Sequence, residues 1–169
     1  DASVWVFGSN RSGQLGLGQI SSRSTIRQVR ELAVRQVACG GFHTLFLTTN
    51  GDLYACGDDG SGQLGNGHSS VTAPTPIPMS CEIESVHCGS QYSVVRATDG
   101  ALWCTGDNRV GQLGMEDTNE RNQFTLLPNL MTTQVACGTH HTVAIDDSNV
   151  LWGWGWGERY QLSPTTSYS

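Results

Sequence analysis

The sequence predicts an all-β fold, a β-propeller of four-stranded antiparallel blades, of which this chain forms a partial ring. Three observations support this prediction. A Gly-Gln-Leu-Gly motif recurs every 49 residues, a Val-x-Cys-Gly motif recurs at the same step, and glycine is abundant, at 21 of 169 residues. A fixed period of this length is typical of repeat architectures, and about four short strands per period is typical of a propeller blade.

Both motifs keep their phase through the chain, so we assign their residues to the architecture of the repeat. A degenerate fourth copy of the first motif is Tyr160-Gln161-Leu162-Ser163. The structural positions are Gly13, Gln14, Leu15, Gly16, Gly62, Gln63, Leu64, Gly65, Gly111, Gln112, Leu113 and Gly114 in the first motif, and Cys39, Gly40, His43, Cys88, Gly89, Cys137, Gly138 and His141 around the second.

The first strands follow from apolar alternation and turn residues. Val4–Phe7 and Thr25–Val29 are expected to be the last two strands of one blade. The Asn50-Gly51 pair predicts a tight hairpin with positive φ at both residues. In the next blade, the fourth strand contains Pro74 and Pro76. Because proline is found on the outer edge strands of sheets, this strand is expected at the outer edge of the blade. The four strands of that blade are Val34–Ala38, His43–Thr48, Asp52–Cys56 and Thr72–Ile77.

The remaining periods repeat this scheme, with hairpin turns at Asp99-Gly100 and around Ser148-Asn149. The expected strands are Glu82–His87, Tyr92–Ala97, Ala101–Thr105 and Gln123–Leu127, then Thr132–Ala136, His141–Ile145 and Val150–Trp154. One domain over 1–169 results, with repeat units 1–33, 34–81, 82–130 and 131–169. Closed propellers usually need four to eight blades, so we expect further blades from the parent chain or another subunit.

Composition narrows the class of protein. All nine basic residues are arginine, the formal net charge is −6, and there is no basic cluster, which argues against direct binding of nucleic acid. No apolar run approaches the roughly 20 residues of a membrane span. The six cysteines are not spaced as in small disulfide-closed loops. This favours reduced thiols, as in a cytoplasmic or nuclear protein.

Metal and catalytic sites are weighed and set aside. The spacings Cys39-x3-His43 and Cys137-x2-His140-His141 suggest zinc, but equivalent positions in neighbouring blades radiate from an axis, and Tyr92 interrupts the set. The loops 57–62 and 106–111 resemble the start of a calcium loop but lack its distal glutamate. We therefore predict no catalytic residue, no cofactor and no metal site.

The tryptophans divide by position. Trp103, Trp152 and Trp154 lie in predicted strands and are expected in the blade core, with Trp5 at an equivalent position. Trp156 follows the last strand, in a loop, and is the best contact aromatic.

Binding is expected where a repeated loop varies between copies. One loop position reads Arg11, Gly60, Arg109 and Glu158, and the position before it reads Asn10, Asp59, Asn108 and Gly157. The alternative is that these residues serve ordinary turn chemistry. The candidate partner-binding residues are Arg11, Asp58, Asp59, Asp107, Asn108, Arg109, Trp156 and Arg159, and those at Arg11, Asp59, Arg109 and Arg159 would form a fringe on one face.

The combined motifs resemble the repeat of the regulator of chromosome condensation family over essentially the whole chain. Val37–Thr44 and Val135–Thr142 match the first half of that repeat, and Phe7–Gly18 matches the second. Cys56 and Thr105 stand where the family often has tryptophan. The resemblance implies a ring that is typically seven-bladed, so roughly half of one would be present here.

Three functions remain open on this resemblance. The first is a protein-interaction scaffold without chemistry of its own. The second is a guanine-nucleotide exchange factor for a Ran-like small GTPase, which would stabilise the nucleotide-free GTPase. The third is a structural subunit of a large complex. The regular 49-residue period leaves no room for an inserted wedge loop, which favours the scaffold.

Overall fold

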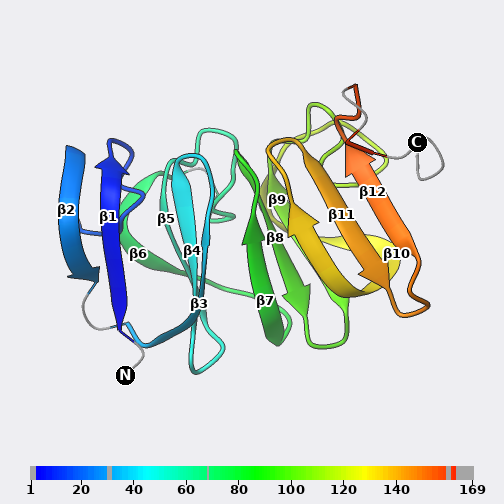
Figure 1. The fold of residues 1–169 in the computed structure, drawn as a ribbon, viewed down its shortest axis with the longest axis horizontal. Coiled ribbons are helices and arrows are strands. Elements are labelled where there is room, and N and C mark those ends of the chain that lie inside the picture. The colour runs from blue at the N-terminus through cyan, green and yellow to red at the C-terminus, as the bar shows by residue number, and fades with distance from the viewer. Residues whose placement is uncertain (1–2, 30–31, 68, 159–160, 163–169) are drawn as a thin grey trace.

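The computed structural model describes residues 3–29, 32–67, 69–158 and 161–162, and in these residues it contains strands, turns and loops but no helix. The sheets stand side by side along the long axis of the molecule (Figure 1). The strands are β1 (Val4–Asn10), β2 (Ser21–Val29), β3 (Val34–Cys39), β4 (His43–Thr48), β5 (Leu53–Gly57), β6 (Val71–Ile77), β7 (Ile83–Cys88), β8 (Tyr92–Ala97), β9 (Ala101–Gly106), β10 (Arg121–Cys137), β11 (His141–Asp146) and β12 (Leu151–Gly155).

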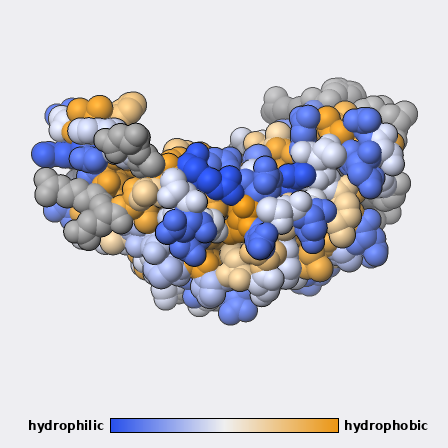
Figure 2. Space-filling model, turned by 90° about the horizontal axis from the view of Figure 1, so that it is seen from below, coloured by the Kyte–Doolittle hydropathy of each residue, from blue (hydrophilic) through white to orange (hydrophobic). Residues whose placement is uncertain are grey.

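The predicted fold class is confirmed. β3, β4, β5 and β6 form one antiparallel four-stranded sheet in chain order, and β7, β8, β9 and the first half of β10 form the next. β1 and β2 form a two-stranded sheet at one end. Seen from below, the molecule is an arc that is hollow on one side, as expected for an open part of a ring (Figure 2).

The predicted strands Gln123–Leu127 and Thr132–Ala136 are one continuous strand, which corrects the expectation of two. The first half of β10 pairs with β9, and the second half pairs with β11. The change of partner coincides with a register shift between Leu126 and Met131, and Asn129 has φ of 60° there. Asparagine tolerates this left-handed conformation, which lets the strand turn from one sheet into the next without ending.

The hairpin turns differ from the predicted two-residue type. Gly51 has φ of 91°, but Asn50 does not have positive φ, and the amide of Gly51 bonds the carbonyl of Thr48 at 3.1 Å. Gly100 and Asn149 repeat this arrangement, with φ of 92° and 62°. These are three-residue loops in which the last residue is left-handed. The prediction for β6 is confirmed, because this proline-bearing strand is an outer edge.

The apolar core lies between neighbouring sheets rather than inside one. One cluster joins Leu45 and Leu53 of β4 and β5 to Val86 and Val95 of β7 and β8. A second joins Val94 and Leu102 to Val135 and Ala144 of the following sheet. Because each sheet needs its neighbour to bury its side chains, the blades stabilise one another in series.

The core prediction for the tryptophans is correct in part. Trp154 is buried, and Trp103 and Trp152 are half-buried against core clusters. Trp5 is 57% exposed, which contradicts its expected core position. The equivalent Trp103 packs on the core shared with the preceding sheet, whereas β1 and β2 have no preceding sheet in the described residues.

Candidate docking face

The Gly-Gln-Leu-Gly motif builds a self-closed loop in each of three repeats. The side-chain oxygen of the glutamine accepts a hydrogen bond from the amide two residues earlier, at 2.9 Å for Gln14, 2.9 Å for Gln63 and 3.1 Å for Gln112. The flanking glycines have positive φ between 68° and 80°. Glycine adopts this conformation without steric cost, so the motif is needed to close the loop.

The residue one step before the variable loop position fixes the same loop from the other side. Side-chain oxygens of Asn10, Asp59 and Asn108 accept hydrogen bonds from the amides of the motif leucines at 2.8–3.0 Å. Asp59 also accepts the amide of Ser69 at 2.8 Å. Asn108 is fully buried, and Asp59 is 3% exposed.

Each loop is also tied to the following repeat. The carbonyl oxygens of Gln14, Gln63 and Gln112 accept hydrogen bonds from hydroxyl groups thirty residues further on, at 2.7, 2.7 and 2.9 Å. The donors are Thr44, Ser93 and Thr142. A loop held by its own amides and by the next blade is a rigid support for exposed side chains.

The equivalent residues Cys56, Thr105 and Trp154 also link each loop to the following repeat. Thr105 donates its hydroxyl to the carbonyl of Gly62 at 2.7 Å, and the Trp154 indole donates to the carbonyl of Gln112 at 2.9 Å. Cys56 lies 3.3 Å from the Gln14 carbonyl through its thiol. Three different side chains therefore supply one donor to the preceding loop.

The second motif places a ring over a glycine. The imidazole of His43 lies against Gly40, the phenol of Tyr92 against Gly89, and the imidazole of His141 against Gly138, so closely that a Cβ on any of these glycines would overlap the ring. The His43 ring is buried and lies 2.9 Å from the Ser93 hydroxyl of the next repeat. Burial lowers the pKa of His43 to about 4.

These contacts assign the His43 and His141 rings to packing over the glycines of the second motif. Among the described residues, no three of the side chains of His, Cys, Asp and Glu gather where they could hold a metal ion. All six cysteines lie within the described residues and are free thiols.

The variable loops and short turns meet on one face of the sheets, here called the loop face: the turns 40–42, 89–91 and 138–140 and the loops 57–62, 106–111 and 155–158. The amides of Asp58, Asp107 and Trp156 bond the carbonyls of Phe42, Gln91 and His140 at 2.8–2.9 Å. The three turns are also linked to one another. The amide of Gly41 donates to the carbonyl of Ser90, and the amide of Ser90 donates to the carbonyl of Thr139.

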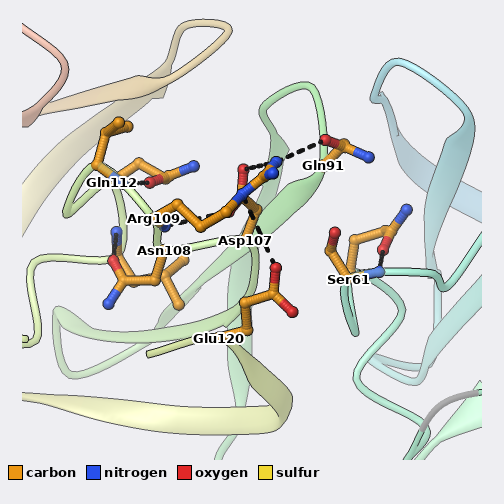
Figure 3. Close-up of polar contacts among 10 residues, drawn as sticks. Ser61, Gln91, Asp107, Asn108, Arg109, Gln112 and Glu120 are labelled. Atoms are coloured by element: carbon orange, nitrogen blue, oxygen red, sulfur yellow. Dashed lines mark hydrogen bonds and ion pairs between the residues drawn. The ribbon is translucent and has the colours of Figure 1, made fainter. Parts of the chain in front are cut away.

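Arg109 is held in place by neighbouring side chains of the loop face (Figure 3). Its guanidinium contacts both carboxylate oxygens of Asp107, at 2.8 and 3.1 Å, and extends between Gln91 at 3.5 Å and Glu120 at 3.9 Å. The Asp107 side chain is 3% exposed, whereas that of Arg109 is 65% exposed. Burial alone would raise the pKa of Asp107, but the hydrogen bonds from Arg109 hold it below its ordinary value.

The candidate contact residues therefore separate into two groups. Arg11 and Arg109 are exposed, Asp58 is half-exposed, and Arg159 lies outside the described residues. Asp59, Asp107 and Asn108 are buried, and their polar atoms hold the loops or Arg109. The turn chemistry kept as the alternative accounts for these three.

Trp156 is half-buried and packs edge-on against His140, with ring centroids 6.4 Å apart and planes at 75°. Beside it the loop face carries residues that sequence reasoning missed. Phe42, Gln91 and His140 occupy one equivalent turn position, and Phe42 is 51% exposed. These residues could have been found from the sequence, because the position two residues after the second motif differs between the repeats.

The fold and the loop geometry define the class of protein: an open segment of a repeat β-propeller with rigid, interlinked loops on one face. The chain belongs to the family whose model is described as the regulator of chromosome condensation (RCC1) repeat, which matches residues 1–47, 50–96 and 99–145. A second model of this repeat matches 34–63, 83–112 and 133–161.

Curated relatives match over single stretches. The chain is 42% identical over 55 residues to the human X-linked retinitis pigmentosa GTPase regulator, covering 31% of this chain and 5% of that protein. It is 39% identical over 59 residues to the secretion-regulating guanine nucleotide exchange factor of Bos taurus, covering 33% of this chain and 13% of that protein. It thus matches only a small part of each relative's length.

Solved structures match over nearly the whole chain. Yeast RCC1 (Prp20), bound to Kap60, superposes with a TM-score of 0.82 at 24% identity, covering 92% of this chain and 40% of that one. Human WBSCR16 superposes with a TM-score of 0.80 at 22% identity, covering 91% and 43%. At these identities the likeness concerns the fold. Separately, the described residues include no helix able to cross a membrane.

Proposed function

We propose that the chain is a protein-docking segment of a propeller and that its loop face is the contact surface. The supporting observation is the pair formed by Arg109 and Asp107, in which a buried carboxylate holds an exposed guanidinium in one orientation. Arginine and aromatic side chains are the residues on which protein interfaces most depend. A guanidinium that is already positioned loses little conformational freedom when a partner binds.

Phe42, His140 and Trp156 complete the surface with apolar and aromatic area. Their backbones are fixed by the links between turns and loops, so the partner would meet a preformed surface. No side chain of the loop face has to perform bond-breaking chemistry for this role. The partner class we propose is a small GTPase, because the relatives include a GTPase regulator and exchange factors by name.

Binding to a panel of purified small GTPases, each in its GDP-bound, GTP-bound and nucleotide-free state, tests the proposal. We expect one member to bind in a biolayer interferometry assay and Arg109→Ala to weaken it at least about tenfold, a loss of about 1.4 kcal/mol. Arg27→Ala is the matched control, since Arg27 is an exposed arginine on the outer strand β2. Equal affinity of both variants and the unchanged protein would exclude the loop face.

Nucleotide exchange on that GTPase is the second candidate function, favoured by the guanine nucleotide exchange factor among the relatives. Exchange requires tighter binding of the nucleotide-free GTPase than of the nucleotide-bound one. Release of a fluorescent GDP analogue separates the two functions. Binding without accelerated release indicates docking alone, and accelerated release that Arg109→Ala removes indicates exchange through the loop face.

A further inference from the structure

The strands β3, β7 and the second half of β10 each have one edge that pairs with no other strand among the described residues. At the junction between β3 and β7, a side chain of β3 occupies this edge of β7. The Gln36 side-chain nitrogen donates to the carbonyl of Val86, and the Gln36 side-chain oxygen accepts from the amide of Val86, each at 3.0 Å. One primary carboxamide thus satisfies both backbone groups of a single residue.

The junction between β7 and the second half of β10 has the same backbone geometry. Val135 is the counterpart of Val86 one period later, and it lies opposite Ala144 as Val86 lies opposite Val95. Opposite residues of an antiparallel ladder alternate between bonded and non-bonded pairs. The amide and the carbonyl of Val135 therefore point away from β11, as those of Val86 point away from β8.

The side chains that face this edge differ from those of the preceding junction. Ser85 stands at the position of Gln36, and His87 stands at the position of Ala38. The serine side chain is shorter and carries no carboxamide, and its hydroxyl lies 3.0 Å from Nε2 of His87. Within the described ranges, no side chain hydrogen-bonds the amide or the carbonyl of Val135. The two groups that Gln36 satisfies in one junction are thus open in the next.

The open edge is bordered by a cation and can be reached from solvent. Arg96 lies opposite Ser85 in the pairing of β7 with β8 and is half-buried. Its Nε donates to the carbonyl of Thr132 at 2.8 Å, and it forms no ion pair with any described residue. Gln134 and Ala136, on either side of the open edge, are exposed. A polar group from outside can therefore approach this edge.

We propose that the backbone edge at Val135 binds the primary carboxamide of a glutamine or asparagine side chain on a partner polypeptide. The carboxamide nitrogen donates to the Val135 carbonyl and the carboxamide oxygen accepts from the Val135 amide, as between Gln36 and Val86. A carboxylate has no donor for the carbonyl, which favours the amide over the acid. Arg96 offers further donors to main-chain carbonyls of the same partner. This site lies on strands rather than on the loop face, and it does not depend on the function proposed above.

A short peptide with one carboxamide is the probe. Acetyl-Ala-Gln-Ala-N-methylamide is titrated into the 15N-labelled 169-residue protein and followed by proton–nitrogen correlation spectra. We expect a saturable shift of the Val135 amide signal with an affinity in the millimolar range, because one side chain makes few contacts. The Val86 amide should not move, since Gln36 already occupies its edge. The same peptide with methionine in place of glutamine should cause no saturable shift.

Two variants exchange the properties of the junctions. Ser85→Gln combined with His87→Ala rebuilds the arrangement of Gln36 and Ala38. The internal carboxamide should then compete for the edge and weaken binding of the peptide at least about tenfold. Gln36→Ser is the reciprocal variant, and it should allow the Val86 amide to shift with the peptide. The dispersion of each spectrum reports whether the variant is folded.

Absence of a saturable shift at Val135, or an equal shift with the methionine peptide, would overturn the proposal. Unchanged binding by a folded Ser85→Gln, His87→Ala variant would do the same. If that variant does not fold, Gln36→Ser decides, and an unmoved Val86 amide in it counts against the site. Tighter binding of a peptide with glutamate in place of glutamine would overturn the carboxamide assignment and identify Arg96 as the group that selects the ligand.

Discussion

The Tyr92 hydroxyl donates a hydrogen bond to the carbonyl oxygen of His141, the residue at the equivalent position of the next repeat, at 2.5 Å. The same hydroxyl lies 3.1 Å from the Gly138 carbonyl and 3.0 Å from the Thr142 hydroxyl. Where His43 reaches a serine of the following blade, tyrosine reaches its backbone. The exchange of one ring for another changes the atom contacted and keeps the two blades linked.

Tyr92→Phe should lower the free energy of unfolding by about 1 kcal/mol, because it removes the hydrogen bonds from the hydroxyl to the next blade, while the His141 carbonyl keeps the Gly138 amide as a donor and the ring still fills the space over Gly89. Urea denaturation followed by tryptophan fluorescence measures the loss. Tyr54→Phe is the control at a half-buried tyrosine, and an equal loss there would contradict the assigned role of the hydroxyl.

Gly89→Ala should be far more damaging, with a loss of about 3 kcal/mol or failure to fold, because the new methyl group would overlap the Tyr92 ring. Gly60→Ala serves as control, since a Cβ there would lie 3.4 Å from the Asp58 carboxylate in an exposed loop. We expect it to change stability by less than about 0.5 kcal/mol. Similar melting temperatures for both variants would refute the ring-over-glycine contact.

Acidification should destabilise the fold through His43. Burial lowers its folded-state pKa from the ordinary 6.5 to about 4, so its contribution to stability is complete above pH 6.5 and declines as pH falls toward 4. The loss between pH 7.5 and pH 5 should be about 2 kcal/mol. In His43→Gln this part of the pH dependence should vanish, and an unchanged pH profile would show that His43 does not cause it.

The thiols should divide sharply in reactivity. Burial raises the pKa of Cys56 and of Cys137 to about 12, and it raises those of Cys88 and Cys104 still further. Cys39 is exposed. Mass spectrometry after brief maleimide treatment at neutral pH should find Cys39 labelled first and the four thiols of raised pKa unlabelled until urea is added. Early labelling of Cys104 would contradict the packing between blades.

Apart from the continuity of β10, the sequence was sufficient to place the strands, because two motifs that fix the backbone recur with the same period. Few other residues can replace a glycine with positive φ or a glutamine whose side chain closes its own loop. These residues therefore recur unchanged in each repeat. It was also sufficient for the outer position of β6, since proline cannot donate to a further strand.

The candidate surface was predictable in part. Asp59 and Arg109 both stand in a variable polar loop, but the carboxylate is turned inward to backbone amides and the guanidinium is turned outward. The sequence of a turn does not reveal whether a polar side chain points inward to backbone amides or outward to solvent, because its hydrogen bonds can be satisfied in either orientation. The continuity of β10 was hidden for a related reason: Pro128-Asn129 resembles a break, but Asn129 takes a left-handed conformation and the strand continues.

A single 17-residue β10 belonging to two sheets has a mechanical consequence. Tension applied along the polypeptide cannot extract the sheet of β11 and β12 without also loading the hydrogen bonds between β9 and the first half of β10. Under force the two sheets should rupture together as one event of combined contour length, whereas β1 and β2, which form a separate two-stranded sheet, should detach separately and earlier.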